Sequence, residues 1–145
     1  MRTLKSEQLS EIRDIAEQCF IELKQPGARL NFEHFCWAVG PALDSEQMVL
    51  WVTGWPVDGF LLVNFAPDLF AGELTGYSIS WFVKPENRSQ GRGSEFLKAF
   101  ELEANRRGCK RFFFGHPFEV NHDANQPWFE KRGFCWVEKL YRKDV

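Results

Sequence analysis

The fold of this chain is decided by the stretch Val83-Lys84-Pro85-Glu86-Asn87-Arg88-Ser89-Gln90-Gly91-Arg92-Gly93-Ser94. Residues 74–83 before the glycines are rich in β-branched and aromatic side chains, which is typical of a strand. Residues 95–107 after them carry apolar side chains at helical spacing, and Gly108 then provides a helix stop. The pattern therefore predicts a strand, a glycine loop and a helix.

A glycine loop that leads into a helix leaves the first backbone N–H groups of that helix without partners inside it. The helix dipole adds partial positive charge at the same end, and Arg88 and Arg92 flank the glycines here. Such a site is suited to phosphate. It is not a Walker A loop, because no Gly-Lys-Ser/Thr follows. It is a poor dinucleotide fingerprint, because bulky Phe96 stands where a third small residue is needed.

Two segments resemble motifs of the GCN5-related N-acetyltransferases, the GNAT superfamily. The run Arg88-Ser89-Gln90-Gly91-Arg92-Gly93, after Val83-Lys84-Pro85, is similar to the family pattern Arg/Gln-x-x-Gly-x-Gly/Ala, which follows a strand ending in Val-x-Pro. The run Trp128-Phe129-Glu130-Lys131-Arg132-Gly133-Phe134 is similar to the family's Tyr-Glu-Lys-x-Gly-Phe segment. The resemblance covers residues 77–145, and the N-terminal half matches only in its order of elements.

The composition predicts one globular domain over residues 1–145, with 44% hydrophobic and 26% charged residues. Fifteen Phe and six Trp predict a core rich in aromatic rings. The formal charge of −2 argues against a dedicated nucleic-acid binder. Residues 1–72 hold 5 Lys/Arg and 10 Asp/Glu, whereas residues 73–145 hold 13 and 10. The half with the glycine loop is therefore the basic half, as an anionic cofactor favours.

The four cysteines, Cys19, Cys36, Cys109 and Cys135, are scattered and form no Cys-x-x-Cys pair. No basic and apolar leader precedes them, and no apolar run approaches the length that spans a membrane. Free thiols in a cytoplasmic protein, with no membrane partner, are the expected arrangement.

The N-terminal half predicts two helices. The first begins near Ser6 as N-cap and ends at Gln25-Pro26-Gly27, and its apolar face holds Leu9, Ile12, Ala16, Cys19, Phe20 and Leu23. The second begins after Asn31 and is expected to stop at Gly40-Pro41. The family's first strand is hard to see in residues 1–4, so we expect it to be missing.

The rest of the chain predicts strands at 48–53, 60–65, 74–83 and 111–115, the last with Phe112-Phe113-Phe114 buried on both faces. A polar loop at 121–127, a short helix at 126–132 and a closing strand at 135–143 follow. The resemblance implies a mixed α/β GNAT fold. Its central sheet is mostly antiparallel, strands four and five form a parallel pair that splays apart, and helices cover both faces.

The resemblance also implies that acetyl-coenzyme A is the cosubstrate and that no metal takes part. By analogy, its pantetheine arm enters a splay between Trp81/Phe82 and Phe114/Gly115. It pairs there with the main chain of Trp81, Phe82 and Val83. The phosphates lie on the loop residues Arg88, Ser89, Gln90, Gly91, Arg92, Gly93 and Ser94. Asn121 and Asn125 are candidates for an asparagine that contacts pantetheine in relatives, although the spacing differs by a residue or more.

The chemistry that the resemblance implies is direct acetyl transfer to a primary amine, which must first lose a proton to a base. His116, just past the fifth strand, is the first candidate base, and His122 and Glu73 are weaker ones. Ser78 and Ser80 either line the acceptor cleft or pack in the sheet. Phe129 stands where family members often carry the tyrosine that protonates the leaving thiolate, so this chain departs from the pattern.

Two classes of function therefore stay open. The first is an acetyltransferase acting on an amine of a small molecule or a protein, and we favour it. The alternative is a GNAT-like module that binds coenzyme A or a partner but has lost turnover, as Phe129 suggests. Only one strand fits after Phe134, which leaves an edge that a second subunit completes if the protein is a homodimer.

Overall fold

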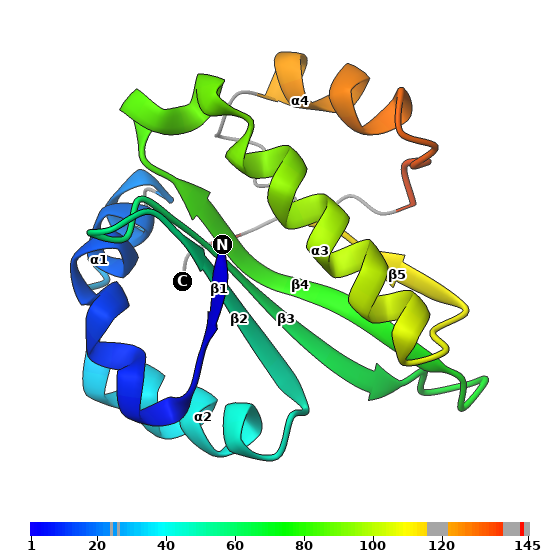
Figure 1. Ribbon diagram of the computed structural model, residues 1–145, viewed down its shortest axis with the longest axis horizontal. Helices are drawn as coiled ribbons and strands as arrows, with labels where there is room; N and C mark the ends of the chain where they lie inside the picture. Colours follow the sequence, from blue (N-terminus) through cyan, green and yellow to red (C-terminus); the bar gives the residue numbers. More distant parts are fainter. Residues whose placement is uncertain (24, 26, 116–121, 138–142, 144–145) are drawn as a thin grey trace. The chain divides into compact units, whose positions relative to one another are not determined.

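The computed structural model describes residues 1–23, 25, 27–115, 122–137 and 143. The chain forms two compact units, residues 1–115 and residues 116–145. The first unit contains a five-stranded sheet of order β1-β2-β3-β4-β5 (Figure 1). The neighbouring strands are antiparallel except β4 and β5, which are parallel.

From β2 to β5 the elements follow one another along the chain as the sequence predicts. The strands are β1 (Arg2–Leu4), β2 (Met48–Thr53), β3 (Gly59–Pro67), β4 (Leu74–Val83) and β5 (Arg111–Phe113). The helices are α1 (Arg13–Glu22), α2 (Phe32–Asp44), α3 (Arg92–Arg106) and α4 (His122–Glu130), with 3₁₀ helices η1 (Ser6–Ile12) and η2 (Pro85–Gln90). The predicted mixed α/β class, with a mostly antiparallel sheet and one parallel pair, is confirmed.

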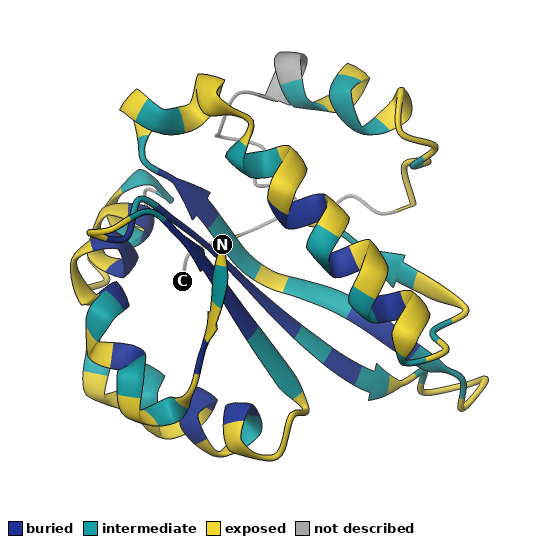
Figure 2. Ribbon diagram, viewed as in Figure 1, coloured by how far each residue is buried: buried dark blue, intermediate teal, exposed yellow. Residues whose placement is uncertain are grey.

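Two hydrophobic cores lie on opposite faces of the sheet, because successive side chains of a strand point to opposite sides. In β2, Leu50 and Val52 join the core that α1 and α2 cover, whereas Trp51 joins the core under α3. Buried residues lie along β2 and β3, in parts of β4 and on one side of α3 (Figure 2). The predicted helices on both faces are thus confirmed.

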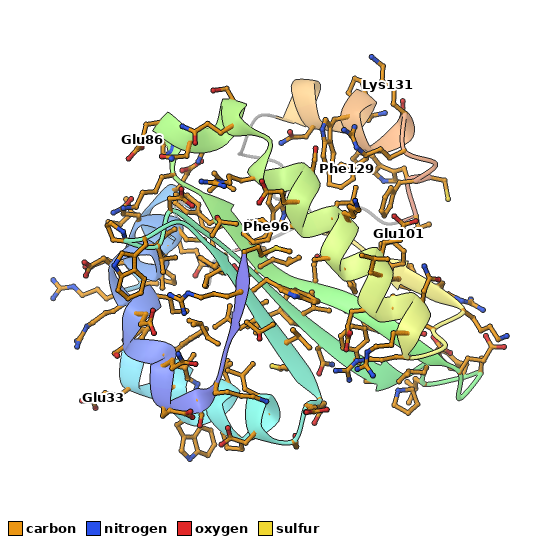
Figure 3. All side chains as sticks on the ribbon, viewed as in Figure 1. Glu33, Glu86, Phe96, Glu101, Phe129 and Lys131 are labelled. Carbon is orange, nitrogen blue, oxygen red and sulfur yellow. The ribbon has the colours of Figure 1, made fainter. Side chains whose placement is uncertain are left out.

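Helix α3 packs closely on the sheet through Phe96 and Phe100, which are fully buried. Phe96 projects from α3 toward the sheet (Figure 3). Gly76 in β4 leaves room for this packing, since a Cβ there would lie 2.7 Å from Cε2 of Phe100. The aromatic run 112–114 is only partly buried, so the prediction that it is buried on both faces was wrong. Strand β5, which contains most of this run, pairs with β4 over three residues only.

A β-bulge interrupts β4 halfway along. Leu62 of β3 pairs with Ser80, and Val63 pairs with Ser78, so Ile79 is an extra residue on β4. Pairing with β5 stops two residues earlier, at Tyr77 opposite Phe113. A bulge bends its strand and increases its twist. The bulge therefore lies just beyond the last described pair of β4 and β5, in the part of β4 where the splay is predicted.

Two predictions for the N-terminal half were wrong. A first strand does exist, because residues 2–4 pair with β2 from Arg2 opposite Val52 to Leu4 opposite Leu50. Helix α2 begins as predicted, with the Asn31 side chain accepting from the His34 N–H at 3.0 Å, but it continues through Pro41 to Asp44. Proline removes one helical hydrogen bond. The cost is small here, since Trp37, whose carbonyl loses that donor, is 74% exposed.

The start of the first helical segment also differs from the prediction. Lys5, not Ser6, is the residue before η1, and the Ser6 hydroxyl instead donates to Asp44 Oδ2 at 2.9 Å. The hydroxyl thereby links the N-terminal segment to the end of α2.

The second unit contains α4, which begins at His122, so the predicted polar loop over 121–127 was wrong from that residue onward. The helix is followed by Gly133 with φ of 83°, the predicted stop. Residues 134–137 form no strand, and the remainder of the predicted closing strand, 138–142, lies outside the described residues.

Candidate functional site

The chain leaves β4 at Val83, passes through η2 and enters α3 at Gly91. Gly91 has φ of 80°, a left-handed conformation that suits glycine, and a Cβ placed there would meet nothing within 4 Å. Its carbonyl accepts from the N–H groups of Ser94 at 3.0 Å and Glu95 at 3.1 Å. Gly91 is therefore the N-cap of α3, and the space beside it is open.

The N–H groups of Arg92 and Gly93 occupy the first two positions of α3, where no carbonyl one turn earlier is available within the helix. The predicted phosphate-binding segment also included Ser94, but its N–H already donates to Gly91. Two helix-start amides beside an open glycine, at the positive end of a 15-residue helix, fit a pyrophosphate group.

Arg88 turns back from the loop instead of pointing out of it. Its Nε donates to the Val83 carbonyl at 3.0 Å, and its terminal nitrogen donates to both carboxylate oxygens of Glu22 at 2.7 and 2.6 Å. The guanidinium also lies over the ring of Phe82, 5.4 Å from its centroid. Arg88 thus links the loop to α1, and the Val83 carbonyl is already hydrogen-bonded.

The Arg92 side chain also contacts carboxylates of the protein itself. Its terminal nitrogen donates to Asp58 Oδ2 at 3.1 Å, and the other lies 3.7 Å from Glu95 Oε1. Its Nε is buried without a hydrogen-bond partner among the described residues. A buried donor without a partner typically lowers the stability of a fold by about 1–3 kcal/mol.

Side chains of β4 reach the end of β5 where the backbone ladder has stopped. The Gly115 N–H donates to Ser78 Oγ at 2.7 Å, and Trp81 Nε1 donates to the Gly115 carbonyl at 2.9 Å. The Trp81 ring meets Phe114 edge to face at 5.1 Å. At the place of the predicted splay, the side chains of Ser78 and Trp81 therefore connect β4 to Gly115, beyond the last described backbone pair.

The opposite side of β4 packs against α1 and β5. Ser80 Oγ lies 3.8 Å from the Cys19 sulfur, and burial raises the pKa of that thiol. The ring of Tyr77 stacks on Phe113 at 5.1 Å. Both predicted serines thus have packing partners: Ser78 contacts Gly115 and Ser80 contacts Cys19.

The structure does not bring Glu73 to the splay. It precedes β4 at the end of the strand far from the glycine loop, and its carboxylate accepts from Arg111 at 2.9 Å. The first candidate base, His116, lies outside the described residues, as does Asn121. Ser89 and Gln90 are exposed at the end of η2.

Asn125 and Phe129 lie in α4, in the second unit. Phe129 packs edge to face on Trp128 at 4.9 Å and on Phe134 at 5.5 Å. The aromatic side chain at this position therefore has a packing role within its own unit.

The sequence analysis missed two features of this region. The bulge at Ile79 leaves no mark in residue types, because it is a property of pairing between two strands. The turn between β2 and β3 places Asp58 against Arg92, a contact between residues far apart in the chain that the sequence did not predict.

The described residues contain neither a metal-binding cluster nor a membrane-spanning helix. No group of three or more His, Cys, Asp or Glu residues in the described ranges is placed to hold a metal ion. None of the helices in the described part of the chain is long and apolar enough to cross a membrane.

The chain matches the model of the acetyltransferase (GNAT) family over residues 9–134. It therefore belongs to this family and is an acetyltransferase, as the two sequence motifs predicted. No curated protein matches the chain.

Solved structures agree on the fold. The predicted acetyltransferase with acetyl-CoA from Clostridium acetobutylicum is 15% identical, with 99% of this chain and 94% of that chain covered at a TM-score of 0.76. A GCN5-related N-acetyltransferase from Ralstonia eutropha JMP134 is 18% identical, with 99% and 96% covered at 0.74. AAC(6')-Iy with the bisubstrate analogue CoA-S-monomethyl-acetylneamine is 18% identical, with 99% and 97% covered at 0.73.

Proposed function

We propose that the protein transfers the acetyl group of acetyl-coenzyme A to a primary amine of a small molecule or a protein. The observation that carries this proposal is the open start of α3 beside the place where β4 and β5 part. The start of α3 suits the phosphates of acetyl-coenzyme A, and the place where the strands part suits its extended pantetheine arm.

The donor site is built from residues of the first unit. The amides of Arg92 and Gly93, next to Gly91, would hold the pyrophosphate with the exposed Ser89 and Gln90 at the rim. The main chain of Trp81 and Phe82 follows the bulge and would accept the pantetheine arm as an added strand. The thioester supplies an activated acetyl group with a fair leaving group, since thiols have a pKa of about 8.5.

An acceptor amine has a pKa of about 10 and must be deprotonated before it attacks. We propose His116 as the base that takes this proton, because an imidazole is partly neutral at neutral pH. Phe129 has no hydroxyl, so the leaving thiolate departs without a tyrosine at that position. Its own modest basicity allows this.

The names of two structural neighbours state amine acceptors. One is AAC(6')-Iy, bound to an acetylneamine analogue, and the other is the ribosomal-protein-alanine N-acetyltransferase from Brucella melitensis biovar Abortus 2308. At 18% and 13% identity neither fixes the acceptor of this chain. They define a first panel: an aminoglycoside, a peptide with an N-terminal alanine, and a polyamine as a third amine class.

The experiment measures free thiol released from acetyl-coenzyme A with each amine, and the mass of the product. Release that depends on an amine, with a product heavier by one acetyl group, supports the proposal. If the protein binds acetyl-coenzyme A but no amine of this panel or of a wider library causes thiol release, the alternative of a binding module is favoured.

The base is tested with a matched pair of variants, His116→Ala and His122→Ala. We expect the first to lower turnover at neutral pH while leaving the dissociation constant for acetyl-coenzyme A unchanged. Turnover of His116→Ala equal to that of the wild type would remove His116 from the mechanism.

A further inference from the structure

Asp58 lies in the turn between β2 and β3 and is almost enclosed, with its side chain only 13% exposed. Its N–H donates to the Thr53 carbonyl at 2.9 Å, and its Oδ1 accepts from the Thr53 hydroxyl at 2.7 Å. Thr53 itself is 1% exposed. The carboxylate is therefore anchored in the sheet end by a buried hydroxyl.

The other oxygen of the same carboxylate faces the segment that leads from β4 to α3. Oδ2 accepts from Asn87 Nδ2 at 3.2 Å and from Arg92 at 3.1 Å. The Asp58 carbonyl accepts from the Lys84 N–H at 2.9 Å. One residue thus contacts the beginning, the middle and the end of the segment that carries the glycine loop.

The turn is shaped around this carboxylate. A Cβ on Gly54 would lie 2.4 Å from Asp58 Cγ, and a Cβ on Gly59 would lie 2.8 Å from the Thr53 hydroxyl. Both are closer than real Cβ contacts, so only glycine fits at either position. The two glycines therefore leave the space that the Asp58–Thr53 pair occupies.

The contacts also decide what the loop offers to an anion. The Arg92 guanidinium faces two carboxylates, Asp58 and Glu95, so much of its charge is balanced inside the protein. The backbone amides at the start of α3 have no such counterpart. What Asp58 supplies to an anion site is thus the fixed position of those amides and not charge.

We infer that Asp58 is a positioning residue for the phosphate site: it holds the loop and the first turn of α3 where their amides meet the pyrophosphate of acetyl-coenzyme A. This inference rests on the proposed function. The alternative is that Asp58 only neutralises the charge of Arg92. Removing the carboxylate would then tighten the binding of an anion and not weaken it.

The test compares two turn aspartates. In Asp58→Ala we expect the dissociation constant for acetyl-coenzyme A to rise about tenfold, since charge-assisted hydrogen bonds that fix the loop are lost. Asp58→Asn keeps the shape and part of the hydrogen bonding and should restore part of the affinity. Asp68→Ala is the matched control, because Asp68 holds the β3–β4 turn through the amides of Phe70 and Ala71 and contacts no residue of the loop in any described interaction.

Calorimetric titration gives the affinities, and urea unfolding shows that each variant is folded. Unchanged or tighter binding in Asp58→Ala overturns the inference, and so does an equal loss in Asp68→Ala. If Asp58→Ala does not fold, Asn87→Ala serves instead, with a smaller loss expected, about threefold; unchanged affinity there also overturns it. If the wild-type protein binds no acetyl-coenzyme A, the proposed function is contradicted. If the wild type and Asp58→Ala bind it equally well, only the role of Asp58 is contradicted.

Discussion

The two ends of α3 treat their backbone groups differently. At the start, the amides of Arg92 and Gly93 have no partner within the helix, and both nearby arginines turn toward carboxylates of the protein. At the end, the Gly108 N–H donates to Asn105 at 3.0 Å and the Cys109 N–H donates to Ala104 at 2.9 Å. One end has donors left for a ligand, and the other is closed by its own chain.

The contrast is instructive because the two glycines are alike. Gly91 has φ of 80° and Gly108 has φ of 74°, and a Cβ at either would meet nothing within 4 Å. Glycine geometry alone therefore does not make a binding site. We expect a site where such a glycine precedes helix amides that have no partner within the helix itself.

The largest effect is expected from Gly91→Val. A β-branched residue is strained at this φ, and its side chain would keep phosphates away from the amides. Losing two hydrogen bonds to a charged group, each worth roughly 1.5–3 kcal/mol, corresponds to a loss of affinity for acetyl-coenzyme A of about a hundredfold or more. Calorimetric titration measures it.

Gly108→Val is the matched control for that variant. It imposes similar strain at the closed end, so stability should fall by a similar amount, about 1–2 kcal/mol. The affinity for acetyl-coenzyme A should not change. A comparable loss of affinity in both variants would mean that the two ends do not differ in function.

The next effect concerns the closed end. Arg107 donates to the Glu46 carbonyl at 2.7 Å and to Glu103 at 2.7 Å, and its guanidinium lies 4.2 Å from the Phe65 ring centroid. Arg107→Ala should lower the free energy of unfolding by about 2–3 kcal/mol without changing the affinity for acetyl-coenzyme A.

Arg106→Ala is the control for Arg107→Ala, because Arg106 binds the same Glu103 but is 65% exposed. Its cost should stay below about 1 kcal/mol. Urea unfolding of the two variants side by side gives both values, and equal losses would refute the role assigned to Arg107.

A smaller effect separates binding from stability at the open end. A Cβ on Gly93 would lie 3.7 Å from Cζ3 of Trp81, an ordinary contact. Gly93→Ala should therefore leave the free energy of unfolding within about 0.5 kcal/mol of the wild type. Its methyl group stands beside a free amide, so affinity for acetyl-coenzyme A should fall about tenfold. The reverse pattern, with stability lost and affinity kept, would place the phosphates elsewhere.

The smallest effect is a pH dependence at the closed end. Hydrogen bonds from Arg106, reinforced by Arg107, lower the pKa of Glu103 to about 2. Since the folded pKa lies below the unfolded value of about 4.3, Glu103 stabilises the fold above that value and stops doing so as pH falls through 2. Glu103→Gln should reduce the loss of stability between pH 5 and pH 2, by less than about 1 kcal/mol. An unchanged pH profile in urea unfolding would show that the pair contributes nothing.

Much of the fold could be predicted because local patterns decide it. The bounds of β2 and β4 follow from apolar, β-branched runs between turn residues, and α2 begins where Asn31 caps it. Strand β1 could not be predicted, since three residues carry no periodicity and their pairing with β2 is non-local. Helix α2 passes Pro41 against its local signal because Val39 and Leu43 pack into the core on both sides of it.

The glycine loop of the candidate site could be predicted from the sequence, but the residues that hold the loop in place could not. The spacing of Gly91 and Gly93 before a helix indicated the free amides directly. The roles of Asp58, Arg88 and the bulge at Ile79 depend on which strands and turns meet in space. The anion site therefore stays a prediction from the sequence, and the structure adds the contacts of its two arginines with Glu22 and Asp58.

The most direct test of this account is a calorimetric titration of the wild-type protein with acetyl-coenzyme A. We expect saturable binding near one molecule per chain, which Gly108→Val retains and Gly91→Val loses. Absence of binding by the wild type would show that the start of α3 is only a turn, and it would contradict the central claim.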